Sequence, residues 1–414
     1  MSDLLPRRAQ ALVTEALADT RVVLVNGARQ AGKSTLTRLA TAGRPGTTVR
    51  LLDDPATLRA AQDEPTEFVE HDGLMVIDEI QLAPELLRPI KVKVDLAPAP
   101  GQFLLTGSSR ILALRTLPDA LPGRMEIIEL WPFSQGEMSG GPDRFIDAAF
   151  HHGPGLTHSS EWRRKDYLER VVVGGFPEAV RRTPRRRAAF FDSYLSTLVE
   201  RDVLEVSNIE RRGDLLKLLA LLASRAGQLL VPAALSSQSG LPRTTLVRYL
   251  ELLASVFLIK TIPAWSSNLT RRAVGTPKLA FVDTGVASHL IGQDAARLAE
   301  PGGAAGPMME NLVVMELARQ LTWSDERGTL YHYRTKDGVE VDAVIETPDG
   351  RVIGIEVKAG ATVRTEDLSG LRSLAGALGE RFVAGFVLYT GPQTLPFGDK
   401  IRAVPLDALW RVAP

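Results

Sequence analysis

Cysteine is absent from this 414-residue sequence. Without cysteine there are no disulfides, no thiol nucleophiles and no zinc sites with cysteine ligands, a composition compatible with a reducing compartment. The sequence also lacks the roughly 18 uninterrupted apolar residues of a membrane-spanning helix, and residues 1–20 lack the apolar segment of a signal peptide. We therefore expect a cytoplasmic protein that has no membrane partner.

Net charge is absent as well, because 49 basic and 49 acidic side chains balance. The 44% hydrophobic and 24% charged residues are typical of globular proteins, and the length predicts roughly two to four domains. Arginines nevertheless gather in the middle third, where such clusters favour either a phosphate-rich partner or a solvated surface. The clusters are Arg163–Arg164, Arg181–Arg182, Arg185–Arg187, Arg211–Arg212 and Arg271–Arg272.

The first motif lies between a predicted strand and a predicted helix. Residues 21–26 (RVVLVN) form a short apolar, β-branched run, and residues 34–41 have a helical pattern. The segment between them, GARQAGKS, matches G-x-x-x-x-G-K-[ST], a loop whose backbone N–H groups and following helix N-terminus bind phosphate oxygens. A chance glycine turn is the alternative. The predicted nucleotide-binding residues are Gly27, Ala28, Arg29, Gln30, Ala31, Gly32, Lys33, Ser34 and Thr35.

Each part of this loop has an expected role. Lys33 should reach the β and γ phosphates of ATP, and the Ser34 hydroxyl should bind Mg²⁺. Gly27 and Gly32 permit backbone angles and close approaches that a Cβ atom would obstruct. ATP and Mg²⁺ are therefore the expected cofactors.

A second motif follows at residues 74–79 (LMVIDE), where four consecutive apolar residues predict a parallel strand buried on both faces. Two carboxylates follow this run. Asp78 is placed to hold the magnesium shell and Glu79 to polarise the attacking water, which is the division of roles that phosphoryl transfer needs.

A third predicted strand, residues 103–106, ends in the polar segment TGSSR. Thr106 or Ser108 is the candidate for sensing the γ-phosphate. Arg124, in LPGR, is a candidate arginine finger that acts in cis or in trans, with a surface salt bridge as the alternative. A finger in trans would require a homo-oligomer, and the sequence leaves open whether one forms.

Together GARQAGKS, VIDEIQ and LLTGSS, with LPGR and GGFPEAV, resemble a large prokaryotic family of AAA-type P-loop ATPases that carry a C-terminal domain of unknown function (DUF4143-type). The resemblance spans nearly the whole chain and implies an α/β core with a parallel sheet. In that family the loop commonly reads Gly-Pro-Arg-Gln. Ala28 replaces this proline, and we expect no effect on phosphate binding.

The middle of the chain is predicted to be helical. Residues 161–206 resemble a helical lid, and residues 215–222, 232–239 and 243–255 read as three helices with a tight turn before the last. This is a helix-turn-helix pattern, expected to form a winged-helix module that contacts DNA or packs against protein. Arg243, Thr244, Thr245 and Arg248 would lie near the exposed or N-terminal side of its recognition helix.

Two acidic motifs stand in the last third, at residues 340–342 (EVD) and 356–358 (EVK). Both lie in runs with strand alternation, and the turn TPDG at residues 347–350 predicts a hairpin between them. Strict alternation puts Val341 and Ala343 on one face and Asp342 on the other. The hairpin would thus present Asp342, Glu356 and Lys358 together.

Glu310 lies at the start of the inward stripe of a predicted helix, where a buried carboxylate needs a partner. One acid from a helix, one from a strand and Glu-x-Lys from the next strand resemble the PD-(D/E)XK nuclease superfamily. The resemblance implies that Asp342, Glu356 and Glu310 bind Mg²⁺ and that Lys358 orients the attacking water. The alternative is a surface hairpin with a salt bridge between Glu356 and Lys358, and members of this superfamily can also lose activity.

The chain is therefore expected to contain an ATPase core (residues 1–150), a helical lid (151–212), a winged helix (213–290) and a restriction-endonuclease-like α/β domain (291–414). The expected function is magnesium-dependent ATP hydrolysis coupled to binding or processing of nucleic acid, with DNA favoured, and with a candidate nuclease site at the C-terminus. Two alternatives are an ATP-controlled switch whose rear domains only bind DNA or protein, and a small-molecule kinase. The carboxylate pair and the long modular tail disfavour the kinase.

Overall fold

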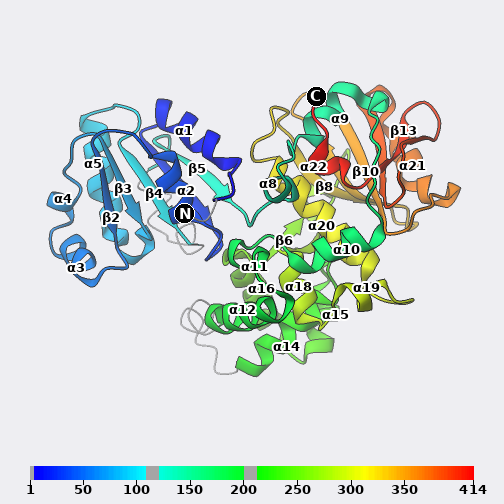
Figure 1. Ribbon diagram of the computed structural model, residues 1–414, viewed down its shortest axis with the longest axis horizontal. Helices are drawn as coiled ribbons and strands as arrows, with labels where there is room; N and C mark the ends of the chain where they lie inside the picture. Colours follow the sequence, from blue (N-terminus) through cyan, green and yellow to red (C-terminus); the bar gives the residue numbers. More distant parts are fainter. Residues whose placement is uncertain (1–3, 109–120, 200–211) are drawn as a thin grey trace. The chain divides into compact units, whose positions relative to one another are not determined.

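The computed structural model describes residues 4–108, 121–199 and 212–414. The chain divides into two compact units, which Figure 1 colours from blue to red along the sequence. The first unit comprises Met1–Pro132 with Ser255–Phe257, and the second comprises Phe133–Ala254 with Leu258–Pro414. Arg211 and the end of the predicted lid lie outside the described residues.

The first unit is built on a five-stranded sheet with the order β2-β3-β4-β1-β5. Every neighbouring pair of these strands is parallel. The strands are β1 (Val22–Gly27), β2 (Thr47–Leu51), β3 (Leu74–Asp78), β4 (Phe103–Gly107) and β5 (Met125–Leu130). The helices are α1 (Ala9–Asp19), α2 (Lys33–Ala40), α3 (Pro55–Asp63), α4 (Pro65–Phe68) and α5 (Leu87–Leu96), with 3₁₀ turns η1 (Ile80–Leu82) and η2 (Pro84–Leu86).

Helices cover both faces of this sheet because its central strands are apolar up to the polar residues at their C-terminal ends. In β1, Val23 and Val25 pack with α1 and with Leu36 of α2. Val22 and Leu24 point the other way, into a cluster that includes Ile90 of α5. The continuous apolar runs thus form a doubly covered parallel sheet, as the sequence predicted.

The second unit opens with a largely helical segment. It contains α8 (Gln135–Ser139), α9 (Phe145–His152), η3 (Gly153–Gly155), α10 (Arg164–Val173), α11 (Pro177–Val180), α12 (Pro184–Thr197), α14 (Arg212–Ala223), α15 (Pro232–Ser239) and α16 (Arg243–Ser255). An antiparallel pair follows, β6 (Ile259–Ile262) and β7 (Lys278–Phe281), with α17 (Leu269–Val274) between the two strands. Three helices and then a two-stranded pair have the order expected of a winged helix, and that assignment stays a prediction.

A six-stranded mixed sheet with the order β12-β13-β11-β10-β9-β8 dominates the C-terminal part. Its strands are β8 (Thr329–Arg334), β9 (Glu340–Glu346), β10 (Val352–Lys358), β11 (Phe382–Tyr389), β12 (Leu395–Pro396) and β13 (Ile401–Pro405). The accompanying helices are α18 (Thr284–Leu290), α19 (Ala295–Ala299), α20 (Ala305–Gln320), η5 (Thr365–Leu368), α21 (Ser369–Leu378), η6 (Gly379–Arg381) and α22 (Ala408–Arg411).

The hairpin between β9 and β10 is present, with Ile353 opposite Ile345, so the predicted adjacency is confirmed. The predicted strict alternation of side-chain facing along β9 is wrong. The pairing of β8 with β9 shifts register between Tyr331 and Tyr333, and Val341 and Val344 pack in the same cluster although they are an odd number of positions apart. A β-bulge has this effect, because one extra residue reverses the facing of the rest.

Candidate nucleotide site and carboxylate cluster

The predicted phosphate loop connects the end of β1 to the start of α2. Gly32, at the N-cap of α2, has a φ of 97°, a left-handed conformation that favours glycine. A Cβ atom on Gly27 would lie 2.1 Å from the carbonyl oxygen of Leu130, so this glycine is required by the close approach of β5. Gln30 also has a positive φ, of 61°. The predicted residues Ala28, Arg29 and Ala31 complete the loop, and Thr35 lies in the first turn of α2.

Lys33 lies at the centre of this loop. Its side chain is 4% exposed, and its ammonium donates to the carbonyl oxygens of Gly27 at 3.2 Å and Ala28 at 3.1 Å. The same ammonium is 3.9 Å from a carboxylate oxygen of Glu79. A cation held by backbone carbonyl oxygens beside a helix N-terminus is suited to bind phosphate oxygens.

Ser34, Asp78 and Thr106 form a hydrogen-bonded chain across three strand ends. The Ser34 hydroxyl donates to Asp78 Oδ2 at 2.8 Å, and the Thr106 hydroxyl donates to the other oxygen of the same carboxylate. The three residues meet because β4 lies between β1 and β3, and parallel strands end at one edge of the sheet.

Glu79 follows β3 in a left-handed conformation, with a φ of 59°. Non-glycine residues with such angles are uncommon and often occur at functional sites. The backbone N–H of Glu79 donates to Thr106 Oγ1 at 3.0 Å. Gln81 donates to the Glu79 carboxylate and, at 3.1 Å, to the Ser108 hydroxyl. We did not predict Gln81, although VIDEIQ contains it, two positions after Glu79.

Arg124 is far from this edge of the sheet. It directly precedes β5, and its carbonyl oxygen accepts the N–H of Val22, the first residue of β1. Its guanidinium pairs with the carboxylate of Asp95, with one contact at 3.0 Å. A finger role in cis is therefore wrong, because the phosphate loop follows the opposite ends of the strands, while a role in trans stays a prediction.

A second polar site lies in the second unit, around Lys278 of β7. The Lys278 ammonium is 2.7 Å from Glu310, 2.6 Å from Glu340 and 3.2 Å from Asp342. We define these four residues, together with Glu356 and Lys358, as the carboxylate cluster. We did not predict Lys278, whose only signal in the sequence is a charge that begins the apolar run KLAF.

Asp342 occupies the point where β9 and β10 separate. The regular pairing of the two strands ends at Ile355 opposite Ala343, and beyond it Asp342 Oδ2 accepts the N–H of Val357 at 2.9 Å. Lys358 lies 3.2 Å from Glu356 and 3.2 Å from Asp367. The predicted Glu356–Lys358 salt bridge is thus present, but the Glu356 side chain is only 14% exposed.

The cluster shifts the pKa values of its members. Burial, followed by the negative charge of Asp342, raises the pKa of Glu310 and that of Glu356 to about 8 each. For Glu340, burial is outweighed by the hydrogen bond and charge of Lys278, and the pKa is lowered. The pKa of Lys278 is raised, because the charges of Asp342 and Glu310 outweigh its burial.

Lys278 therefore occupies the position of a cation among three carboxylates. Within residues 4–108, 121–199 and 212–414, no group of three or more His, Asp or Glu side chains is placed to hold a metal ion. The structure does bring Glu310, Asp342 and Glu356 together, but a metal ion here would have to displace Lys278. Metal binding by these residues stays a prediction.

Family models match three parts of the chain. A model described as "AAA domain" matches residues 19–139. Two models described as domains of unknown function match residues 164–297 (DUF8612) and 305–409 (DUF4143). An uncharacterized protein of Mycobacterium bovis and one of Mycobacterium tuberculosis are each 30% identical over 406 residues, covering 97% of this chain and 84% of the relative. The chain belongs to this family of AAA-type ATPases.

Solved structures resemble the ATPase only distantly. A Walker-type ATPase of Pyrococcus abyssi is 17% identical, with a TM-score of 0.40 over 70% of this chain and 96% of that chain. The RuvB Holliday junction branch migration motor of Thermotoga maritima is 18% identical, with a TM-score of 0.27 over 63% of this chain and 90% of that chain. Scores this low do not establish a shared arrangement of the whole chain.

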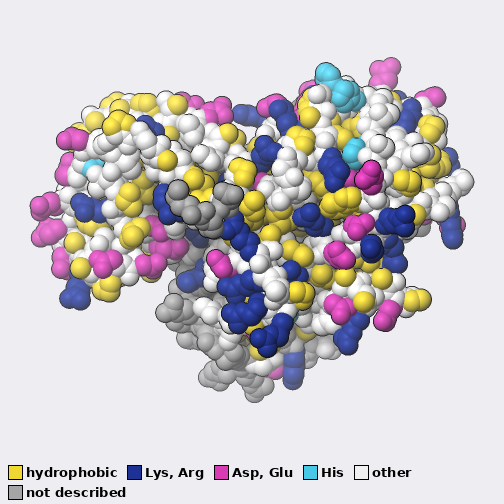
Figure 2. Space-filling view, viewed as in Figure 1, with side chains coloured by type: hydrophobic (Ala, Val, Ile, Leu, Met, Phe, Trp, Pro, Cys, Tyr) yellow, Lys and Arg dark blue, Asp and Glu magenta, His cyan; other side chains and the backbone are white. Residues whose placement is uncertain are grey.

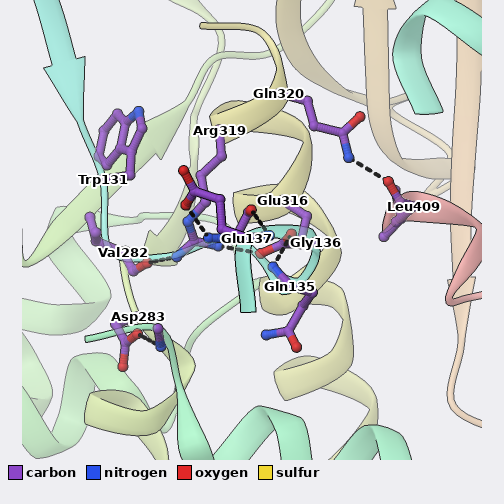
Figure 3. A network of polar contacts seen from close by, with 12 residues as sticks. Trp131, Gln135, Gly136, Glu137, Val282, Asp283, Glu316, Arg319, Gln320 and Leu409 are labelled. Carbon is purple, nitrogen blue, oxygen red and sulfur yellow. Dashed lines mark hydrogen bonds and ion pairs between the residues drawn. The ribbon is translucent and has the colours of Figure 1, made fainter. Parts of the chain in front are cut away.

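The interior of the ATPase's second unit contains a buried ion pair on α20. Figure 3 shows Arg319 and Glu316, whose charged atoms lie 2.7 Å apart. Arg319 also donates to the carbonyl oxygen of Val282 at 2.8 Å, and Glu316 accepts the N–H of Gln135 at 2.9 Å. These bonds connect segments distant in sequence and indicate a structural role.

The GGFP segment is also structural. A Cβ atom on Gly174 would lie 2.3 Å from the carboxylate of the buried Asp283, and one on Gly175 would lie 2.2 Å from the carbonyl oxygen of Phe133. The N–H of Gly175 donates to Asp283 at 2.6 Å.

In the part of the ATPase that the structure describes, none of the helices is long and apolar enough to cross a membrane.

Proposed function

We propose that the ATPase uses Mg²⁺ to hydrolyse ATP and couples this turnover to the binding of nucleic acid, with DNA as the favoured ligand. The observation that carries the hydrolysis part is the convergence of Lys33, Ser34, Asp78 and Glu79 at one edge of the sheet. Turnover without any added acceptor would separate this function from that of a small-molecule kinase.

The donor set at this edge fits magnesium. The Ser34 hydroxyl and the Asp78 carboxylate supply hard oxygens 2.8 Å apart, and these two residues would hold the ion. When bound, Mg²⁺ neutralises charge that develops on the phosphates. Lys33 binds the β and γ phosphates, and Glu79 orients and polarises the attacking water. Thr106 contacts both Asp78 and Glu79, so its hydroxyl positions the two acids relative to each other.

Exposed arginines support the nucleic-acid part of the proposal. On α16, Leu246, Leu250 and Leu253 are buried, whereas Arg243 and Arg248 are exposed. Figure 2 shows Lys and Arg side chains gathered where Figure 1 draws α11 and α12, a region that contains the exposed residues Arg185 and Arg186. Such clusters suit the phosphate backbone of DNA.

The coupling is tested by ATP turnover with and without duplex DNA, at a fixed salt concentration. We expect DNA to stimulate the wild type, and the double variant Arg243→Ala/Arg248→Ala to lose most of this stimulation while it keeps basal turnover. Arg372→Ala, which removes an exposed arginine from α21, is the control. Unchanged stimulation in the double variant would contradict the proposed coupling through α16.

DNA cleavage is a second candidate function, favoured by the convergence of Asp342, Glu356 and Lys358. The position of Lys278 argues against it unless nucleic acid or metal displaces that side chain. A cleavage assay on plasmid, linear and single-stranded DNA, with Mg²⁺ and with or without ATP, decides between the two. Cleavage lost in Asp342→Ala and in Lys358→Ala would establish a nuclease. Intact DNA under all conditions, with ATP turnover retained, would leave a binding module in an ATP-controlled switch.

A further inference from the structure

A pocket of about 690 Å³ lies in the second unit, and Arg334, one of its lining residues, pairs with Glu340 of the carboxylate cluster. It is lined by the segments on either side of α17 and by the end of β8. Residues that matter for the argument are Trp265, Thr276, His332, Tyr333, Arg334 and Lys336. Its volume lies within the range of about 300–1,000 Å³ that small-ligand pockets occupy.

Two aromatic rings stand together in this pocket. The ring centroids of Trp265 and Tyr333 are 6.0 Å apart, at an interplanar angle of 64°. Trp265 is held in place, because its indole N–H donates to Glu346 at 3.2 Å and the Arg272 guanidinium lies 5.4 Å from its ring. Tyr333 is partly exposed. A fixed aromatic pair with one accessible ring suits the flat face of a base.

Basic side chains follow immediately in sequence. Lys336 is exposed, and the Arg334 side chain is 44% exposed. Arg334 pairs at 2.7 Å with Glu340, whose other carboxylate oxygen contacts Lys278. Positive charge beside an aromatic surface is the combination that binds single-stranded nucleic acid, and the Arg334–Glu340–Lys278 series joins this pocket to the carboxylate cluster.

His332 adds a buried polar group to the lining. It is 1% exposed, and its Nε2 lies 3.0 Å from the carbonyl oxygen of Thr276, so Nε2 carries the hydrogen. Burial lowers the pKa of His332 to about 4, which keeps the ring neutral. The other nitrogen, Nδ1, is then an acceptor, and it has no hydrogen-bond partner among the described residues. A buried acceptor without a partner is uncommon in a stable interior.

We propose that this pocket binds one unpaired nucleotide of a single-stranded nucleic acid, with the base on Tyr333 beside Trp265 and the phosphate near Arg334 and Lys336. The inference rests on the proposed binding of nucleic acid and specifies the form of the ligand. An unpaired base exposes its face to an aromatic side chain, whereas a base inside a duplex is stacked between its neighbours.

Fluorescence anisotropy of the full-length protein without ATP tests this proposal. The probes are a labelled single-stranded oligothymidylate and a labelled duplex of equal length, with thymidine monophosphate as competitor. We expect Tyr333→Ala to weaken single-strand binding about tenfold, because stacking of one base is lost. Tyr333→Phe keeps the ring and should bind as the wild type does. Lys336→Glu, at an exposed position, should also weaken single-strand binding and leave the fold intact.

Three results would overturn the proposal. If both Tyr333→Ala and Lys336→Glu bound the single strand as tightly as the wild type, the pocket would not be the site that binds the nucleotide. Duplex binding through α16 would not be affected by this result. Failure of the wild type to bind either probe would contradict both the proposed binding of nucleic acid and this inference. Tyr333-dependent capture of thymidine monophosphate, with no tighter binding of the oligonucleotide, would assign the pocket to free nucleotides instead.

Discussion

The hydroxyl of Ser34 donates to the carboxylate of Asp78 over 2.8 Å, although 44 positions separate the two residues. Neither residue could position the other through local structure alone. They meet because β1 and β3 run parallel on either side of β4, so that the segments after these strands share one edge of the sheet. The proposed magnesium site is therefore a property of strand order, and substitutions there should act on chemistry more than on folding.

Lys33→Ala should reduce ATP turnover by at least about a hundredfold, because the buried ammonium at the centre of the phosphate loop is lost. The fold should survive, since Lys33 lies in the phosphate loop, where its ammonium contacts the carbonyl oxygens of Gly27 and Ala28 and the Glu79 carboxylate. Phosphate release measures turnover, and circular dichroism checks folding. Arg38→Ala, an exposed position on the same helix, is the control. Wild-type turnover in Lys33→Ala would show that this loop is not part of the active site.

The Thr106 hydroxyl should matter through its position between Asp78 and Glu79. Thr106→Val keeps the shape and removes the hydroxyl, so we expect turnover to fall about tenfold or more while nucleotide affinity changes little. Thr106→Ser restores the hydroxyl and should recover most of the activity. Equal activity of the Val and Ser variants would show that the bonds of Thr106 to Asp78 and Glu79 do not affect catalysis.

Arg124→Ala should leave ATP turnover within about twofold of the wild type, because Arg124 lies at the edge of the sheet away from its own phosphate loop. The comparison should be repeated over a range of protein concentrations. A loss of about a thousandfold or more would instead identify a finger supplied in trans by another subunit. Asp95→Ala removes the partner of Arg124 within the same chain. A loss of turnover that occurs in Arg124→Ala but not in Asp95→Ala would therefore come from the finger role and not from the salt bridge.

The carboxylate cluster predicts that stability falls with rising pH. Glu310 and Glu356 have pKa values of about 8 in the folded protein against an ordinary 4.5. The folded state thus keeps protons that the unfolded state releases, and the resulting stability is complete below the ordinary value and lost as pH rises through about 8. Urea unfolding at about pH 6 and about pH 9 measures this difference.

The double variant Glu310→Gln/Glu356→Gln should reduce this pH dependence, since neither amide can release a proton. Glu366→Gln, at an exposed position on η5, should leave the dependence unchanged. If the wild type were as stable at the higher pH as at the lower one, the cluster would not hold these two protons.

The ion pair on α20 predicts a large effect on folding. Arg319→Ala leaves the buried Glu316 carboxylate without its cation, which should lower the free energy of unfolding by about 3–5 kcal/mol. Glu316→Gln/Arg319→Met removes both charges and should cost less than the single change. Denaturant titration of the three proteins tests this order. A double variant less stable than Arg319→Ala would contradict the argument.

Much of the nucleotide site could be predicted because its signals are local. The loop GARQAGKS, the apolar run before Asp78 and the strand that ends at Thr106 each carry their own pattern, and the structure places all three at one edge. The hairpin of β9 and β10 is similarly local, since the turn TPDG forces its two strands to pair. Gln81 was missed because a polar residue two positions after Glu79 is common in loops.

The sequence by itself therefore determined the α/β class, the phosphate loop and the residues at the strand ends, because short-range patterns of apolar and turn residues specify them. Only the tertiary structure decided that Arg124 lies away from the phosphate loop, that a bulge breaks the alternation of β9 and that Lys278 lies among three carboxylates. Each of these depends on which strand neighbours which and on contacts between distant segments, and no periodicity along one segment encodes such contacts.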